Sequence, residues 1–176
     1  GAPGSGKTAL VNALAKTANV PIITVNMSVL VAYPKKIKSI LNTVFDLAAT
    51  MKNGCVMLFN SFPAVTNFSP ELLMFFHNHF ISKVVEAQNA IVIISTANEP
   101  FSMPAFYFED NAFSQNKSIL MQAPILSTRQ KLLEYYFEKF EVPLAKDVSS
   151  EQLARNTLGM YPKDLEYIVR ETKLHV

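Results

Sequence analysis

The 176-residue chain has little charge, one cysteine and no long apolar run. A net charge of +2 is too small to indicate a nucleic acid or a membrane surface as partner. The one cysteine, Cys55, excludes a disulfide framework and favours an intracellular, reducing compartment. No apolar run approaches the roughly 20 residues that span a bilayer, and no signal peptide is recognisable. With 49% hydrophobic residues, we expect a packed globular domain.

Arginine is also scarce, because the chain contains only Arg129, Arg155 and Arg170. Small-molecule phosphotransferases with a phosphate-binding loop usually clamp phosphates with several arginines from a mobile lid. Three scattered arginines therefore argue against a nucleotide kinase, which stays a less favoured alternative.

A complete phosphate-binding loop opens the sequence, as Gly1-Ala2-Pro3-Gly4-Ser5-Gly6-Lys7-Thr8. The glycines let backbone N–H groups turn toward phosphates, Lys7 reaches the β- and γ-oxygens, and the Thr8 hydroxyl can bind Mg²⁺. We expect these eight residues and Ala9 to bind ATP; a glycine-rich turn without a ligand is the alternative. Such a loop normally follows a buried strand, and residue 1 is not methionine. We therefore expect a fragment of a longer protein that lacks its first strand.

Segments with helical periodicity alternate with short apolar segments, which predicts an α/β fold with a parallel sheet. The predicted helices are 9–18, 37–51 and 70–87, and the predicted strands are 21–26, 55–59, 91–95 and 118–121. Past Pro124 only helices are predicted, at 128–140, 150–156 and 162–173. We therefore predict an α/β nucleotide-binding subdomain at 1–123 and a small helical lid at 124–176.

The second predicted strand ends without a carboxylate, in Asn60-Ser61. A hydrolysing nucleotidase normally carries an aspartate for Mg²⁺ there, often followed by a glutamate that polarises water. Asn60 can accept a hydrogen bond from a metal-bound water but brings no charge, and Ser61 is no carboxylate base. A core strand unrelated to nucleotide is the alternative. Asn98 follows the next strand, where it can contact the γ-phosphate or position water; an ordinary loop asparagine is nearly as well supported.

Together these segments resemble the AAA+ ATPases, in the AAA subgroup that includes valosin-containing protein, the NSF-type factors and the peroxisome-biogenesis ATPases. Residues 1–8 match the Walker A loop, 55–61 stand where Walker B belongs, and Asn98 stands at the first-sensor position. Residues 147–154, 157–159 and 164–165 match the lid signature. The resemblance implies ATP and Mg²⁺ as cofactors, a hexameric homo- or hetero-ring of AAA subunits, and a protein substrate.

The chain departs from the family pattern at several functional positions. No arginine occurs at 99–127, where the finger that a subunit lends to its neighbour is expected. Tyr33 lies near the pore-loop aromatic, without the usual glycine. Tyr136 stands where a histidine commonly lies beside adenine, and Gly159 belongs to the lid contact with the nucleotide. Lys163 follows Pro162 where Gly-Ala is usual, so the second-sensor role stays open.

These losses predict a domain that binds ATP, holds Mg²⁺ weakly and hydrolyses poorly, with no confident catalytic residue. It would support the ring of a protein-remodelling or translocating ATPase whose second AAA domain is active. The expected parent is a tandem peroxisome-biogenesis ATPase (peroxin-6-like) for matrix protein import, cytoplasmic or at the peroxisomal membrane through partners. An active ATPase of the valosin-containing-protein or NSF type is the main alternative, and a scaffold without nucleotide is another.

Overall fold

The computed structural model describes residues 1–76, 78, 91–99 and 118–174. The chain divides into two compact units. The larger is Thr8–Ile119, and the smaller joins Gly1–Lys7 to Leu120–Val176. The phosphate-loop residues before Thr8 thus group with the helical segment. The boundary expected near Ala123 remains a prediction.

The larger unit is built on a parallel sheet, in which the described strands follow the order β1-β2-β3. The strands are β1 (Ile22–Asn26), β2 (Cys55–Asn60) and β3 (Ile91–Ser95). Asn26 lies opposite Asn60, and Phe59 lies opposite Ser95. The carboxyl ends of the strands therefore meet at one edge, which is where parallel α/β sheets bind ligands. The α/β class predicted from the sequence is confirmed.

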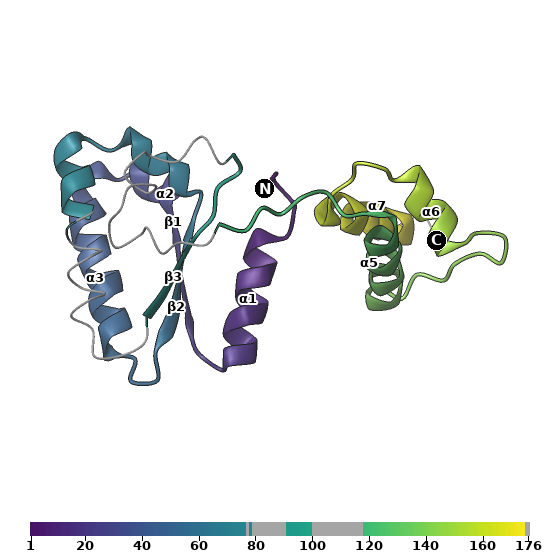
Figure 1. Ribbon diagram of the computed structural model, residues 1–176, viewed down its shortest axis with the longest axis horizontal. Helices are drawn as coiled ribbons and strands as arrows, with labels where there is room; N and C mark the ends of the chain where they lie inside the picture. Colours follow the sequence, from purple (N-terminus) through teal and green to yellow (C-terminus); the bar gives the residue numbers. More distant parts are fainter. Residues whose placement is uncertain (77, 79–90, 100–117, 175–176) are drawn as a thin grey trace. The chain divides into compact units, whose positions relative to one another are not determined.

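Two helices cover opposite faces of this sheet, α1 (Lys7–Ala18) and α3 (Ile37–Thr50) (Figure 1). Alternate residues of β2 divide between them, because successive strand side chains point to opposite faces. Met57 and Phe59 pack in the cluster that contains Phe45 of α3. Val56 and Leu58 pack with Val11 and Ala15 of α1. All of β2 except its last residue is buried, as its continuous apolar run predicted.

Three short elements were not predicted from the sequence. They are α2 (Met27–Val31), η1 (Pro34–Lys36) and η2 (Phe62–Asn67). The Asn26 side chain caps α2 by accepting hydrogen bonds from the N–H groups of Ser28 and Val29. The elements are five, three and six residues long, which is too short to show helical periodicity.

Two further predicted elements have different outcomes. Residues 118–121 were expected to form a strand, which is wrong, because the structure describes them as irregular chain. Ile119 and Leu120 are 75% and 62% exposed, and an extended apolar segment forms a strand only beside a partner. Of the helix expected at 70–87, residues 70–76 and 78 are helical, and the remainder lies outside the described residues.

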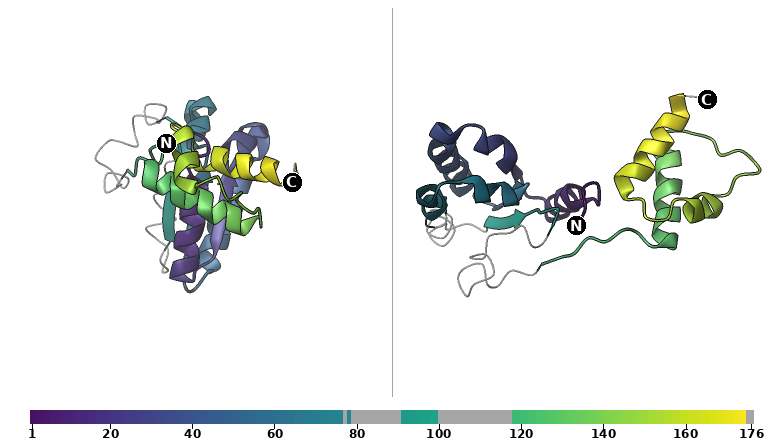
Figure 2. Two further views of the ribbon diagram at one scale, coloured as in Figure 1. Left: turned by 90° about the vertical axis from the view of Figure 1, so that its right-hand side faces the viewer. Right: turned by 90° about the horizontal axis from the view of Figure 1, so that it is seen from above.

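The smaller unit contains α5 (Leu126–Lys139), α6 (Ser150–Asn156) and α7 (Pro162–Leu174). The three helices lie beside one another (Figure 2, right). Their shared core contains Leu133, Ala154, Leu165 and Val169, each at most 1% exposed. The three helices predicted at 128–140, 150–156 and 162–173 are thus present, within two residues at either end. Among the described residues no helix is long and apolar enough to cross a membrane.

Candidate functional site

The phosphate loop occupies residues 1–6 and leads directly into α1, whose first residues are Lys7, Thr8 and Ala9. Gly4 and Gly6 have φ of +79° and +96°, values that L-residues with a side chain rarely adopt. A tight turn donates a hydrogen bond from Ser5 N–H to the Ala2 carbonyl at 3.2 Å. The free N–H groups of a helix's first turn bind anions. The loop therefore has the backbone that phosphate binding requires.

The Lys7 ammonium lies within its own loop. Its Nζ donates hydrogen bonds to the carbonyls of Gly1 at 2.6 Å and Ala2 at 2.9 Å. Burial lowers the pKa of Lys7 from its ordinary value, because removal from water disfavours the charged form. A phosphate that binds Lys7 has to compete with these two carbonyls, and its negative charge would favour the protonated amine.

Ser5 holds a buried hydroxyl inside the loop. The residue is 4% exposed, and its Oγ has no hydrogen-bond partner among the described residues. A Cβ added at Gly1 would lie 3.1 Å from this Oγ and would also collide with the Met121 carbonyl oxygen. An orphaned buried hydroxyl is costly, and a ligand with acceptor oxygens would satisfy it.

The helical segment touches the loop at Gly4. The Lys163 N–H donates to the Gly4 carbonyl at 3.2 Å. A Cβ added at Gly4 would lie only 2.9 Å from Cβ of Lys163. Position 4 thus requires glycine for two reasons, the positive φ of its backbone and the close approach of α7.

In the larger unit, Asn60 joins two hydroxyls at the carboxyl edge of the sheet. Its Oδ1 accepts hydrogen bonds from Thr8 Oγ1 at 3.3 Å and from Thr96 Oγ1 at 3.0 Å. The backbone extends the β2–β3 pairing here, because Thr96 N–H donates to the Phe59 carbonyl and Phe62 N–H to the Thr96 carbonyl. The structure therefore places Thr8 in contact with Asn60. Thr8 is the residue expected to bind the metal, and Asn60 stands where an aspartate is usual.

The other two predicted residues of this edge are placed differently. Ser61 is exposed and has a φ of 55°, a left-handed conformation that turns the chain into η2. Asn98 is exposed and lies two residues beyond Thr96. In the segment after β3, Thr96 donates a hydrogen bond to Asn60, and we did not predict this residue. The only signal for it was a polar side chain directly after a buried strand.

The two lid residues that were predicted to contact the nucleotide differ in burial, because Tyr136 is buried and Gly159 is exposed. Tyr136 is 8% exposed and stacks on Phe140, with ring centroids 6.2 Å apart. Burial, together with Glu166 and Tyr135, raises the pKa of the Tyr136 hydroxyl. Gly159 has a φ of +83°, and no atom of the described residues would lie within 4 Å of a Cβ added there. Adenine contact by these residues remains a prediction.

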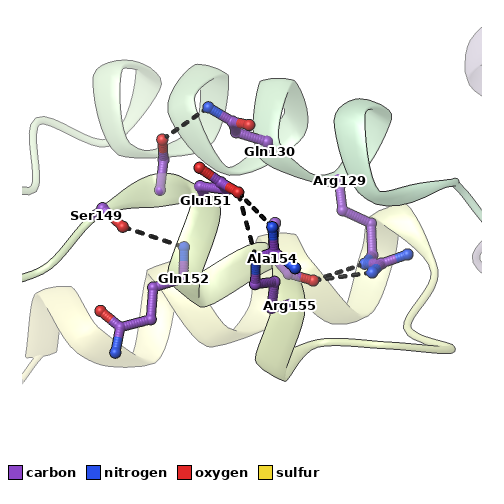
Figure 3. Close-up of polar contacts among 8 residues, drawn as sticks. Arg129, Gln130, Ser149, Glu151, Gln152, Ala154 and Arg155 are labelled. Carbon is purple, nitrogen blue, oxygen red and sulfur yellow. Dashed lines mark hydrogen bonds and ion pairs between the residues drawn. The ribbon is translucent and has the colours of Figure 1, made fainter.

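All three arginines make contacts within the helical unit. Arg129 is 3% exposed, and its guanidinium donates to the Ala154 carbonyl (Figure 3). The guanidinium also donates to the Pro124 carbonyl. Arg155 pairs with Glu151 at 2.6 Å, and Arg170 pairs with Glu166 at 3.1 Å. The two surface pairs are weak, whereas Arg129 is fixed by burial.

Thr8 and Asn60 offer a cation two neutral oxygens, one of a hydroxyl and one of an amide. Mg²⁺ prefers carboxylates together with phosphate oxygens. No group of three or more His, Cys, Asp or Glu side chains in the described parts of the chain can hold a metal ion. Thr8 and Asn60 thus fit Mg²⁺ only as weak neutral ligands, and the charge that holds the ion has to come from the nucleotide.

Comparison with known proteins gives a family for the chain. Residues 1–117 match the ATPase family associated with various cellular activities (AAA). This match covers more than half of the chain, so the protein belongs to the AAA family. Members of this family usually form oligomeric rings, bind ATP and typically use Mg²⁺.

The similar curated proteins include several bacterial ATP-dependent zinc metalloproteases. FtsH of Thermotoga maritima is 28% identical over 185 residues, which cover 99% of this chain and 29% of that protein. FtsH 1 of Bdellovibrio bacteriovorus is 26% identical over 185 residues, with coverage of 99% and 28%. FtsH of Caulobacter vibrioides is 27% identical over 188 residues, with coverage of 99% and 29%. The chain thus spans less than a third of the length of these relatives.

Proposed function

We propose that this AAA-family domain binds ATP as a structural element of an oligomeric ring and hydrolyses it poorly. The observation that carries the proposal is the neutral Asn60 amide hydrogen-bonded to Thr8. The phosphate loop has its glycine conformations and its lysine, whereas the strand end beside Thr8 lacks a carboxylate. ATP that is bound and not cleaved would stabilise the folded, assembled domain by linkage.

The arginines support the same proposal. A finger supplied from one subunit to another contributes roughly 10³–10⁵ in rate in related nucleotidases. Arg129 is buried and bonded to backbone carbonyls, so it cannot extend to a neighbour without breaking those contacts. With neither a carboxylate nor a committed finger, turnover is expected to be negligible, while phosphate contacts from the loop remain.

A finer proposal concerns the parent protein. The degenerate strand end suits the non-hydrolysing member of a tandem pair, and the peroxisome-biogenesis ATPases are the proposed parent on that resemblance alone. The proposed parent would hold Mg²⁺ weakly, form a hexameric ring and translocate a protein substrate. It would be located in the cytoplasm or at the peroxisomal membrane.

An active ATPase of the AAA-protease type is the second candidate. The similarity to ATP-dependent zinc metalloproteases over 99% of the chain favours it. In this case another group would have to replace the missing carboxylate.

The test measures ATP binding by calorimetry and phosphate release by the same purified chain. We expect binding with turnover far below about 1 s⁻¹, the low end of typical enzyme rates. Lys7→Ala should weaken binding about 100-fold, because it removes a charge-assisted phosphate contact. Lys16→Ala, on the same helix, is the matched control and should bind normally.

Each alternative predicts a different result. Ordinary turnover that Lys7→Ala abolishes would support the active ATPase. Absence of binding at millimolar ATP would support a scaffold without nucleotide, and phosphoryl transfer to a nucleoside monophosphate would support a kinase.

A further inference from the structure

We propose that the Asn60 amide donates an N–H group to a phosphate oxygen of the bound nucleotide, in place of a metal ion. The domain then binds ATP without a divalent cation, and Thr96 is the residue that positions the amide. The inference rests on the proposed function and specifies the form of the nucleotide that the site takes.

The oxygen of the Asn60 amide is already used. Its Oδ1 accepts hydrogen bonds from Thr96 Oγ1 at 3.0 Å and from Thr8 Oγ1 at 3.3 Å. An amide oxygen has two lone pairs, and two hydroxyl donors occupy both. This oxygen is also the atom of the amide that ligates Mg²⁺ or accepts from a metal-bound water. A cation at Asn60 would therefore have to displace a hydroxyl donor.

The nitrogen of the same amide is available. Nδ2 carries two N–H donors, and within the part of the chain that the structure describes it makes no hydrogen bond. Asn60 is half-buried at the end of β2, where a donor without an acceptor is unfavourable. Because the two hydroxyls hold Oδ1, the amide presents its N–H groups on its other side. A ligand with acceptor oxygens would satisfy them.

The surroundings of Asn60 favour an anion as that ligand. Thr8 belongs to the first turn of α1, which contains no acidic residue, and such a turn attracts phosphates through its free N–H groups. The buried Ser5 hydroxyl of the preceding loop lacks a partner among the described residues, which independently indicates a ligand with acceptor oxygens. An aspartate beside phosphates needs a cation between the two negative groups, whereas a neutral amide can donate to them directly.

Thr96 is placed to fix the amide in this orientation. It is 8% exposed, and its backbone is bonded on both sides, to the Phe59 carbonyl and to the Phe62 N–H. The Thr96 hydroxyl is thus held at the end of the sheet. Without this hydroxyl, the Asn60 oxygen regains a lone pair and the amide can turn that oxygen toward a cation. Thr96 therefore determines whether the site prefers free ATP or its Mg²⁺ complex.

The experiment measures the dissociation constant of ATP for the full chain by calorimetry, once with excess Mg²⁺ and once with EDTA, at equal ionic strength. Thr96→Val removes the hydroxyl and keeps the shape, and Thr96→Ser keeps the hydroxyl. Thr17→Val is the matched control, because Thr17 is an exposed threonine in the last turn of α1 whose hydroxyl bonds to the Ala13 carbonyl. Thermal unfolding of each variant without nucleotide checks the fold.

We expect the dissociation constants of the unsubstituted chain in Mg²⁺ and in EDTA to agree within about twofold. Thr96→Val should weaken binding about fivefold in EDTA, because the amide loses its fixed orientation, and should weaken it less in Mg²⁺. Thr96→Ser and Thr17→Val should keep the original affinities.

A dissociation constant of the unsubstituted chain that is lower in Mg²⁺ by more than about twofold would overturn this inference and leave the proposed function standing. Equal affinities of Thr96→Val and the unsubstituted chain in EDTA would also overturn it. An equal loss in both conditions that Thr96→Ser does not restore would do the same, since it indicates a structural role. If the unsubstituted chain binds ATP in neither condition, the proposed function itself fails.

Discussion

The phosphate loop and the strand edge at Asn60 differ in the functional groups that each contains. The loop has left-handed glycines, an ammonium that donates to the loop's own carbonyls, and a buried hydroxyl with no hydrogen-bond partner among the described residues. The edge at Asn60 is a closed set of neutral hydrogen bonds, between an amide oxygen and two threonine hydroxyls. The Ser5 hydroxyl of the loop can donate to an anion, whereas the edge at Asn60 has no charge with which to activate water. Holding and cleaving ATP are thus separable properties, and sequence change can remove one without the other.

The largest expected effect is that of replacing the buried Arg129, which tests whether this residue serves ATP hydrolysis or the stability of the fold. Arg129→Met should lower the free energy of unfolding by about 3 kcal/mol, because the Pro124 carbonyl loses its bond to the guanidinium and a buried network is broken. The Ala154 carbonyl keeps a bond from Thr157 Oγ1, which limits the loss. Urea unfolding followed by circular dichroism measures the change.

Arg155→Met is the control, because its pair with Glu151 is exposed and separated by one helical turn. It should cost no more than about 0.5 kcal/mol. If Arg129→Met leaves stability intact and lowers turnover in an assembled ring, Arg129 takes part in ATP hydrolysis. The distinction between a domain that holds ATP and one that cleaves it would then be wrong.

The next effect tests the fit of the phosphate loop to α7. Gly4→Ala should weaken ATP binding about tenfold, because the new Cβ needs a strained φ and collides with Lys163. Gly54→Ala provides the matched control, since its φ is also positive, at +82°, and it lies in the turn before β2, at the opposite end of that strand from Asn60. It should cost about 1 kcal/mol of stability and leave the ATP affinity unchanged. Calorimetry and thermal unfolding separate the two effects; equal losses of affinity would refute the role of the α7 contact.

The smallest effect concerns the neutral edge. Asn60→Asp places a carboxylate against Thr8, so ATP binding should become about fivefold tighter with Mg²⁺ than after chelation by EDTA. The unsubstituted chain should show a weaker dependence on Mg²⁺. Turnover should stay low, because Ser61 and the arginine-free segment 99–127 are unchanged.

Asn26→Asp controls for the added charge. Asn26 ends the neighbouring strand opposite Asn60, and its Oδ1 caps α2, a role that aspartate also fills. A gain in Mg²⁺ dependence for Asn26→Asp as large as for Asn60→Asp would mean that the position of the charge is irrelevant.

Much of the fold was predictable because its signals are local. Glycine spacing followed by lysine and threonine predicted the phosphate loop, and the apolar run before Asn60 predicted a strand buried on both faces. The extended segment at 118–121 was predicted wrongly for the same reason. Its apolar residues satisfy a local pattern, whereas a strand needs a neighbour that the pattern does not provide.

The sequence by itself determined that this protein has a loop for phosphates, an α/β body, a helical segment, and no carboxylate where a hydrolysing strand would end. These properties depend on residue type and on spacing along the chain. Only the tertiary structure decided that Asn60 meets Thr8 and Thr96, that α7 begins against Gly4, and that Arg129 is buried among carbonyls. The physical reason is that close approach between distant segments is set by the packing of whole elements, which spacing along the chain does not specify.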